Sequence, residues 1–165
     1  MSPEERSRAI PLLFNMISIR PSKYEELGVI AEFQMKLADE TESIALDKLL
    51  VSTGIKALFG DPGKGVYYVA EAGEEIVGCF LITYEWSDWR NGMIWWLQSV
   101  YVKESHRKQG VFKNMYDHLI KTISNDPTII GLRLYVDKSN TRAQQVYQAL
   151  GMNGDHYTVF EWMKK

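Results

Sequence analysis

One junction constrains this chain more than any other feature, because a strand pattern passes through a short basic loop directly into a helix pattern. Residues 93–102 are rich in aromatic and β-branched side chains, which favour strands. From Phe112 onward apolar side chains recur at helical spacing, and the loop before it, residues 107–110, reads Arg-Lys-Gln-Gly. The first N–H groups of a helix have no partner within it and carry partial positive charge, and a glycine lets a ligand approach the backbone closely. The junction therefore predicts a binding site for an anion such as phosphate.

The loop also resembles a known motif. Arg107 stands three residues before Gly110, a spacing similar to the Gln/Arg-x-x-Gly-x-Gly/Ala pyrophosphate-binding loop of the GNAT superfamily of N-acetyltransferases. One position departs, because Phe112 stands where Gly or Ala is usual in that family. Its ring either narrows the channel for pantetheine and pyrophosphate or lies on the buried side of the helix. The three-glycine Rossmann fingerprint and the Gly-Lys-Ser/Thr P-loop are both absent from the sequence.

A second segment resembles the same family and follows in the family's order. Asn140, Ala143, Tyr147 and Gly151-Met152 match the pattern Asn-x-x-Ala-x-x-x-Tyr-x-x-x-Gly-Phe closely. Apolar residues at helical spacing end at Gly151, a residue type favoured just past a helix end. Asn140 stands at a strand-to-helix corner, where its side chain can cap the helix, hydrogen-bond the pantetheine arm as the resemblance implies, or do both.

The order of the expected elements agrees with this resemblance, which covers residues 16–162. The resemblance implies an α/β (α+β) GNAT acyltransferase fold, with a mixed central sheet of about six to seven strands flanked by about four helices. Hydrophobic periodicity and turn residues predict the following order: a strand at 16–20, helices at 22–37 and 43–59, strands at 66–71, 75–85 and 93–102, a helix from 112, a strand at 132–136, a helix from 140, and final strands.

Length, composition and charge exclude several classes of protein. The 165 residues are 45% apolar, which is enough for one domain with a substantial core. We assign residues 16–165 to a single GNAT domain and residues 1–15 to an N-terminal extension, disordered or translated from an upstream start codon. A net charge of −2 gives no electrostatic case for nucleic acid, and the apolar runs are too short to span a bilayer.

The thiol and imidazole side chains predict no special chemistry. Cys79 is the only cysteine and lies in an apolar run, so we expect a core position and a reducing cytoplasm. The three histidines show no ligand spacing with cysteine or carboxylates, and we expect no metal. Because GNAT relatives commonly pair, the resemblance also implies a homodimer.

Within the superfamily, residues 85–102 look most like the polyamine and diamine acetyltransferases, and the likeness fails at the catalytic base. Those enzymes have a Leu-Glu-Asp strand where this chain has Leu97-Gln98-Ser99. A carboxamide cannot carry away a proton at neutral pH. An alkylamine, with a pKa of about 10.4, must nevertheless lose one proton to become a nucleophile.

Other acids are candidates for that proton, directly or through water. Glu85 and Asp88 end the preceding strand, Glu40 and Glu42 lie between the first two helices, and Gln98 can instead orient a water molecule. All four acids also fit a solvated helix face or turn. The resemblance places the first-to-second helix segment beside the acceptor. We therefore name four residues as candidate substrate contacts: Glu40, Glu42, Trp86 and Asp88.

The resemblance implies direct transfer of the acetyl group from acetyl-CoA to an amine in one ternary complex, with no covalent enzyme intermediate. Backbone N–H groups between Ser99 and Tyr101 would stabilise the charge on the thioester oxygen. Tyr147, at the family's tyrosine position, is the candidate general acid for the departing thiolate, although its place on the buried stripe also fits packing alone.

The expected contacts with acetyl-CoA fall into three groups. Backbone groups of the strand pair with pantetheine amides as an added strand would, the basic loop surrounds the pyrophosphate, and the second motif completes the set. The residues are Val100, Tyr101, Val102, Arg107, Lys108, Gln109, Gly110, Val111, Phe112, Lys113, Asn140 and Tyr147.

The function predicted from sequence is an N-acetyltransferase that moves acetyl from acetyl-CoA to a primary amine of a small molecule, polyamine- or diamine-like or another amine. Two alternatives remain. One is a catalytically silent acyl-CoA-binding regulatory module, which Gln98 and Phe112 motivate, and the other is an acetyltransferase for protein or peptide amines.

Overall fold

The structure is a computed structural model that describes residues 16–164. The extension predicted for residues 1–15 lies outside the described residues. The chain divides into two compact units, one ending at Arg133 and the other beginning at Leu134. The assignment of residues 16–165 to a single domain stays a prediction.

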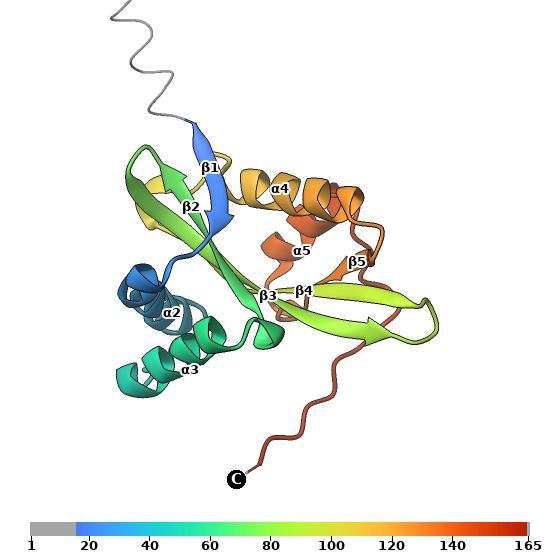
Figure 1. Cartoon of the computed structure of the whole chain (residues 1–165), viewed down its shortest axis with the longest axis horizontal. Helices are drawn as coiled ribbons and strands as arrows, with labels where there is room; N and C mark the ends of the chain where they lie inside the picture. The colour runs from blue at the N-terminus through green and yellow to red at the C-terminus, as the bar shows by residue number, and fades with distance from the viewer. Residues whose placement is uncertain (1–15, 165) are drawn as a thin grey trace, which may run out of the picture. The chain divides into compact units, whose positions relative to one another are not determined.

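The first unit is built on a five-stranded mixed sheet (Figure 1). Strands β1 to β4 pair with one another in antiparallel fashion, whereas β5 runs parallel to β4. A parallel pair needs a crossover connection, and helix α4 (Val111–Asn125) provides it. The strands are β1 (Ile17–Pro21), β2 (Val66–Ala72), β3 (Glu75–Ser87), β4 (Gly92–Val102) and β5 (Ile129–Arg133).

Helices cover the two faces of this sheet, as Figure 1 shows, with α2 (Leu27–Glu42) and α3 (Lys48–Gly60) on one side and α4 on the other. On the first face the ring of Phe33 in α2 lies 5.0 Å from the ring of Tyr101. On the opposite face Tyr68 stacks on Phe80 and lies 5.8 Å from the ring of His118 in α4. Successive strand residues point to opposite faces, so both faces of β2 to β4 bury apolar side chains.

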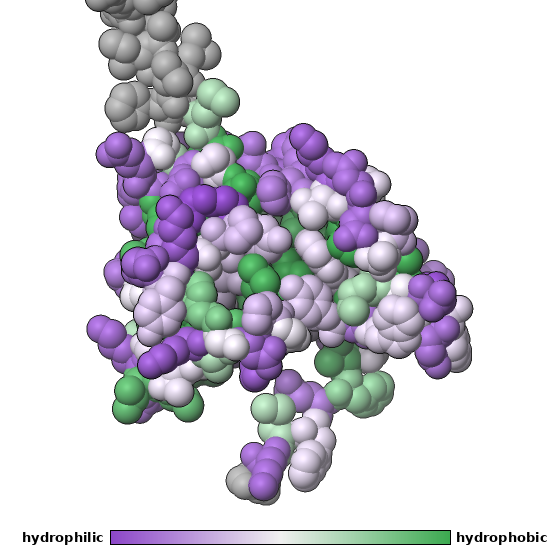
Figure 2. All heavy atoms as spheres, viewed as in Figure 1, coloured by the Kyte–Doolittle hydropathy of each residue, from purple (hydrophilic) through white to green (hydrophobic). Residues whose placement is uncertain are grey.

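The core lies mainly between the sheet and α2. Ile30, Phe33, Val69 and Cys79 are almost fully buried there, and each large apolar side chain contributes about 1.5–3 kcal/mol by leaving water. Burial raises the pKa of the Cys79 thiol to about 12, so the thiol behaves as a small apolar group, as the sequence predicted. On the face drawn in Figure 2, apolar side chains lie in small areas between polar ones.

The helices begin later than the sequence pattern predicted. Ser22 stays extended and donates its N–H to the carbonyl of Tyr67 at 2.8 Å. A 3-10 turn, Tyr24–Glu26, then leads into α2. In α3 the side chain of Asp47 caps the N–H of Leu50 at 2.8 Å, which places the start five residues after the expected one.

The second unit contains α5 (Thr141–Ala149) and a C-terminal segment. The expectation of about four helices is confirmed by α2 to α5, but the expectation of six to seven strands was too high, because the described residues form five. The strand predicted at 132–136 begins earlier and ends at Arg133, and residues 155–164 form no strand. Aromatic and β-branched residues are frequent in that last segment, but a strand also needs a paired neighbour for its backbone. Its aromatic side chains are exposed instead, and Phe160 has an exposed fraction of 93%.

Candidate active site

The strand before the basic loop contains a β-bulge. Where the register of β3 and β4 shifts, two residues of β4, Ser99 and Val100, face the single residue Phe80. Ser99 has a φ of 53°, in the left-handed region that residues other than glycine seldom adopt. A bulge releases one residue from the ladder and bends the strand. The backbone N–H groups expected to face the reacting carbonyl therefore lie at a local break in the sheet.

The same stretch of β4 has an open edge. Strand β5 pairs only with Met93 to Trp96, so residues 97–102 are paired with β3 on one side and have no strand on the other within the described part of the chain. Val100, Tyr101 and Val102 lie on this edge. An extended ligand with amide groups can add to such an edge as a further strand would.

The loop that follows delivers the start of α4. A 3-10 turn, Glu104–His106, precedes Lys108 and Gly110, whose φ values of 62° and 80° lie in the left-handed region. Gly110 is the N-cap of α4, and no side chain caps the helix there, so its first N–H groups are available to an anion. Gln109 and Asn114 close the loop, donating to the carbonyls of Ser105 at 2.8 Å and Gly110 at 2.9 Å.

The first helical residues divide between core and surface. Val111 is buried, Phe112 is half-buried, and Lys113 is exposed and pairs with Asp117 one turn later. The remaining buried residues of α4 are Met115, Tyr116 and Leu119. Phe112 thus sits at the border of the buried stripe, which is compatible with both roles considered for its ring.

Arg107 and Glu40, expected on opposite sides of the reaction, contact each other. The guanidinium of Arg107 forms an ion pair with Glu40 at the end of α2 and lies 5.6 Å from the ring centre of Tyr101. Its Nε donates to the carbonyl of Val102 at 2.9 Å, and the hydroxyl of Tyr101 donates to Glu40 at 3.3 Å. The hydrogen bond to Glu40 raises the pKa of Arg107, so its charge is fixed and partly neutralised.

Gln98 is oriented by a neighbouring strand. Its side-chain amide donates to the hydroxyl of Thr83 at 2.8 Å. This contact identifies the nitrogen end of the carboxamide and leaves the oxygen end as the acceptor. Gln98 can therefore accept a hydrogen bond from an amine or a water molecule, but it cannot remove a proton.

Glu85 is held by two donors. Its carboxylate accepts from the indole of Trp96 at 2.6 Å and from the guanidinium of Arg133 at 2.6 Å. The hydrogen bond from Trp96, with help from Arg133, lowers the pKa of Glu85. A carboxylate with two engaged oxygens and a lowered pKa is a weak proton acceptor.

The other candidate acceptor residues lie on the surface. Glu42 is the last residue of α2 and is exposed, and Asp88 lies in the β3–β4 turn, where it accepts from the N–H of Trp89 at 2.9 Å. Trp86 is 59% exposed. An aromatic face this accessible can meet a cation.

The second motif forms the helix that its pattern predicted. Asn140 caps α5, accepting from the N–H of Ala143 at 3.0 Å, so the capping role is confirmed. Gly151 has a φ of 86° just past the helix end, as a C-terminal glycine should. Tyr147 is half-buried, and burial raises the pKa of its hydroxyl, which stays protonated at neutral pH.

Two residues near the bulge were missed by the sequence analysis. Gln34 of α2 donates its side-chain amide to the carbonyl of Ser99 at 3.2 Å, and Tyr67 of β2 shares a side-chain hydrogen bond with Ser99. The available signal was a polar residue within the apolar stripe of α2, between Ala31 and Leu37. Tyr67 gave no signal, because aromatic residues are common in strands.

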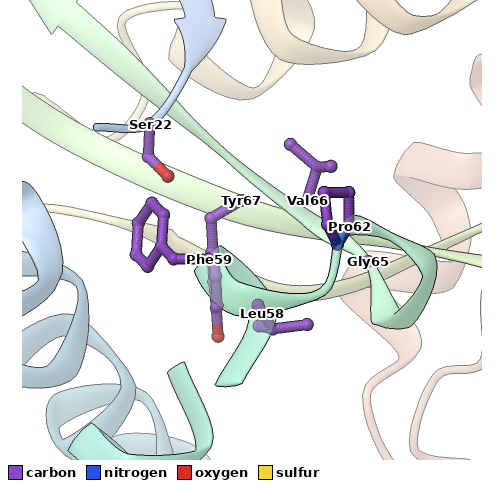
Figure 3. A pocket seen from close by; sticks show the side chains of 7 residues that line it. All are labelled: Ser22, Leu58, Phe59, Pro62, Gly65, Val66 and Tyr67. Atoms are coloured by element: carbon purple, nitrogen blue, oxygen red, sulfur yellow. The ribbon is translucent and has the colours of Figure 1, made fainter. Parts of the chain in front are cut away.

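Two pockets are lined in part by residues of α2 and α3. The smaller, of about 170 Å³, is shown in Figure 3, where Tyr67 stands beside Phe59 and Leu58 from the end of α3. The larger, of about 500 Å³, lies between α2 and the segment before α3. The smaller pocket is lined by Ser22, Leu58, Phe59, Pro62, Gly65, Val66 and Tyr67.

Two further properties follow from the described residues. Among them, no group of three or more histidine, cysteine or acidic side chains is arranged to hold a metal ion. None of their helices combines the length and apolar character needed to cross a bilayer.

Solved structures resemble this chain over most of its length. A possible acetyltransferase from Clostridium difficile 630 is 39% identical, covers 91% of this chain and 99% of its own, and has a TM-score of 0.85. A predicted acetyltransferase from Clostridium acetobutylicum, solved with acetyl-CoA, is 17% identical with coverages of 88% and 96% and a TM-score of 0.70. A ribosomal-protein-alanine N-acetyltransferase from Brucella melitensis biovar Abortus 2308 is 13% identical, with coverages of 90% and 100% and a TM-score of 0.73.

The sequence itself matches a family. No curated protein sequence matches the chain significantly. The model of the acetyltransferase (GNAT) family, however, matches residues 30–152, which include the bulge and both motifs, the basic loop and the segment from Asn140 to Met152. The chain therefore belongs to the GNAT family of acetyltransferases and is an acyltransferase.

Proposed function

We propose that this acyltransferase moves the acetyl group of acetyl-CoA to a primary amine of a small molecule, polyamine- or diamine-like or another amine, by direct attack in a ternary complex. One observation supports this most strongly. The bulge, the open edge of β4 and the Gly110 loop follow one another without interruption from Ser99 to Val111. This order suits a ligand that has a carbonyl at one end, amides in the middle and a diphosphate beyond them.

The residues present fit acetyl-CoA. The backbone of residues 100–102 would pair with the pantetheine amides, and the first N–H groups of α4, with Lys108, would hold the diphosphate. Arg107 would contribute once a phosphate oxygen replaces Glu40 as its partner. The cosubstrate supplies an activated thioester, and the protein holds it in place.

The reaction needs charge stabilisation and one proton transfer in each direction. A carbon–nitrogen bond forms as the carbon–sulfur bond breaks, the amine loses a proton, and the departing thiolate gains one. A backbone N–H at the bulge would stabilise the oxygen that becomes negative, a contribution of about 3 kcal/mol for each such donor. We assign the donation of a proton to the thiolate to Tyr147, whose hydroxyl is protonated at neutral pH.

Removal of the amine proton is assigned to water. Gln98, held by Thr83, presents its carboxamide oxygen as an acceptor that orients the amine or that water. Glu85 is the weaker candidate because both of its oxygens already accept hydrogen bonds. Glu40, Glu42 and Asp88 would attract a cationic acceptor, with Trp86 adding an aromatic face.

The test is release of free CoA thiol, followed with a thiol-reactive dye, when the protein is mixed with acetyl-CoA and a panel of amines. The panel contains diamines, polyamines, aminoglycosides, amino acids and peptides. We expect turnover with at least one small amine. Turnover with peptides alone would move the proposal to a protein or peptide amine acetyltransferase.

A second candidate is a catalytically silent module that binds acyl-CoA for regulation. Gln98 favours it, because no carboxylate stands at the position of the base. Tight acetyl-CoA binding with no turnover across the panel would support this candidate. A homodimer and a cytoplasmic location stay predictions, and light scattering on the purified protein tests the first.

A further inference from the structure

Gln34 is a polar side chain in an apolar environment. It is 9% exposed on the buried stripe of α2, beside Ile30 and Ala31. Its amide nitrogen donates to the carbonyl of Ser99 at 3.2 Å and lies 3.4 Å from the sulfur of Cys79. Burial of a carboxamide is unfavourable unless it is hydrogen-bonded, and an apolar residue would fill the space without that cost. The hydrogen bond to the bulge is therefore the feature that distinguishes glutamine at this position.

Ser99 needs support from its surroundings. Its left-handed φ of 53° is sparsely populated for a residue with a Cβ and persists only where neighbouring groups fix it. Gln34 of α2 donates a hydrogen bond to the carbonyl of Ser99. Tyr67 of β2, which is 6% exposed, hydrogen-bonds the side chain of Ser99. Two separate elements thus fasten one residue of the bulge.

We propose that Gln34 and Tyr67 are positioning residues that hold the bulge at Ser99, so that the backbone N–H released there points at the thioester carbonyl. This inference rests on the proposed function, because it concerns the same acetyl-CoA site. Both residues act through Ser99 and need not touch the ligand. In the proposed function the start of α4 binds the diphosphate. Loss of the support for the bulge should therefore weaken the hydrogen bond to the thioester carbonyl and leave the affinity for CoA unchanged.

The size of the effect follows from the role of the released N–H. Removal of one donor to a developing oxyanion lowers kcat by about 100- to 1,000-fold in enzymes of known mechanism. A donor that is displaced but still present loses only part of its stabilisation of the oxyanion. We therefore expect kcat to fall about 10- to 100-fold when Gln34 can no longer donate its hydrogen bond to Ser99. Loss of the Tyr67 hydroxyl alone should have a smaller effect in the same direction.

The experiment compares two variants with a matched control. Gln34→Met keeps the length of the side chain and removes the donor, and Tyr67→Phe keeps the ring and removes the hydroxyl. The control is Thr122→Val, which removes a partly buried hydroxyl that donates within α4, to the carbonyl of His118 at 2.8 Å. For each protein we would measure kcat, KM for acetyl-CoA, and the affinity for CoA by calorimetry, at matched folded fraction.

A spectroscopic measurement separates positioning from general loosening of the fold. Infrared difference spectra of bound acetyl-CoA, labelled with carbon-13 at the thioester carbonyl, report hydrogen bonding to that oxygen. In the wild type the carbonyl stretch should move to lower wavenumber on binding. In Gln34→Met the shift should shrink, with CoA affinity unchanged, and Thr122→Val should match the wild type. This measurement remains available for Tyr67→Phe if Gln34→Met fails to fold.

The outcomes distinguish this inference from the proposed function. Wild-type kcat and an unchanged carbonyl shift in both folded variants would overturn the inference and leave the proposed function standing. A carbonyl shift that shrinks in the variants, in a protein that turns over no amine, would support the inference and refute the transfer reaction. Absence of acetyl-CoA binding by the wild type would overturn both.

Discussion

The donor side and the acceptor side of the candidate site are assembled in different ways. The donor side is one continuous segment, residues 99–113, in which a bulge, an open strand edge and a helix start follow in order. The acceptor side is assembled by α2, whose Gln34 and Glu40 contact Ser99 and Arg107 across 65 and 67 residues of sequence. Local geometry thus builds the donor side apart from the support of its bulge by α2 and β2, whereas tertiary packing assembles the acceptor side, and changes to the two sides should have different signatures.

The largest effect is expected on the donor side, at Gly110. A Cβ there would have room, since its nearest neighbour is the side-chain nitrogen of Asn114 at 3.9 Å, so the cost of a side chain comes from the φ of 80°. A left-handed conformation costs about 1–2 kcal/mol for a residue with a Cβ, and β-branched residues fit it worst. Gly110→Val should therefore weaken acetyl-CoA binding about 30-fold in calorimetry, because each 1.4 kcal/mol is about tenfold.

The control for this change is Gly54→Ala. Gly54 lies inside α3, and no atom is within 4 Å of a Cβ placed there. Alanine favours helix over glycine, so this variant should keep its affinity for acetyl-CoA and gain stability. An unaltered affinity in Gly110→Val would show that the start of α4 does not hold the diphosphate.

The next effect concerns the acceptor side, at Gln98. With no carboxylate at this position, the rate should be limited by the fraction of acceptor amine that is unprotonated. For an alkylamine with a pKa of about 10.4, kcat/KM for the acceptor should rise about tenfold per pH unit up to that pKa. Gln98→Glu, still within reach of Thr83, should raise the rate at neutral pH about tenfold and flatten the profile, since a general base commonly contributes at least that much.

The matched variant for this test is Thr83→Val, which removes the partner that orients Gln98. It should lower the rate without changing the slope of the pH profile. If the wild-type profile levels off well below the pKa of the acceptor, a group on the enzyme already removes the proton. The assignment to water would then be wrong.

A smaller effect should appear where the two sides meet, at the pair of Glu40 and Arg107. Both side chains are 40% exposed, and exposed ion pairs contribute about 0–1 kcal/mol. Glu40→Gln removes the competitor of the diphosphate and should tighten acetyl-CoA binding about threefold, most clearly at low salt. It should also raise KM for a cationic acceptor. Weaker acetyl-CoA binding in this variant would show that Glu40 orients Arg107 for the cosubstrate.

Sequence alone predicted the local structure of the donor segment because that information is local, and its role in binding acetyl-CoA stays a prediction. Arg107, Gly110 and Val111 lie within five residues of sequence, and the expected helix begins at Val111. The capping role of Asn140 is equally local, since its partner is three residues away.

Features that depend on tertiary contacts, on either side of the site, could not be predicted in the same way. The bulge follows from a register shift between two strands, and nothing in residues 97–100 marks it. Glu40 was named as a substrate contact and Arg107 as a phosphate contact, but only the fold shows them paired. The strands expected after the last helix do not form, because residue types that favour strands do not supply a pairing partner.

The smallest effect concerns the support of α2, which carries Gln34 and Glu40. Before α2 the guanidinium of Arg20 bonds Glu26 and Glu71, joining β1, the turn that leads into α2, and β2. These hydrogen bonds lower the pKa of both carboxyls below their unfolded value of about 4.3. Groups with a lowered pKa contribute stability that is present above the unfolded value and lost as pH falls through the folded one, so the free energy of unfolding should decline below about pH 5.

Arg20→Gln should remove about 0.5 kcal/mol of stability at neutral pH and little at pH 3, so that its unfolding curve in urea converges with the wild-type curve on acidification. Lys64→Gln, which breaks the more exposed ion pair with Asp61, should change the stability neither at neutral pH nor at pH 3. Because Arg20 supports α2 and lies outside the donor segment, its loss should lower turnover before it lowers acetyl-CoA affinity. Equal losses of both would show that the donor side depends on α2 as well, and the contrast between local and tertiary assembly would not extend to function.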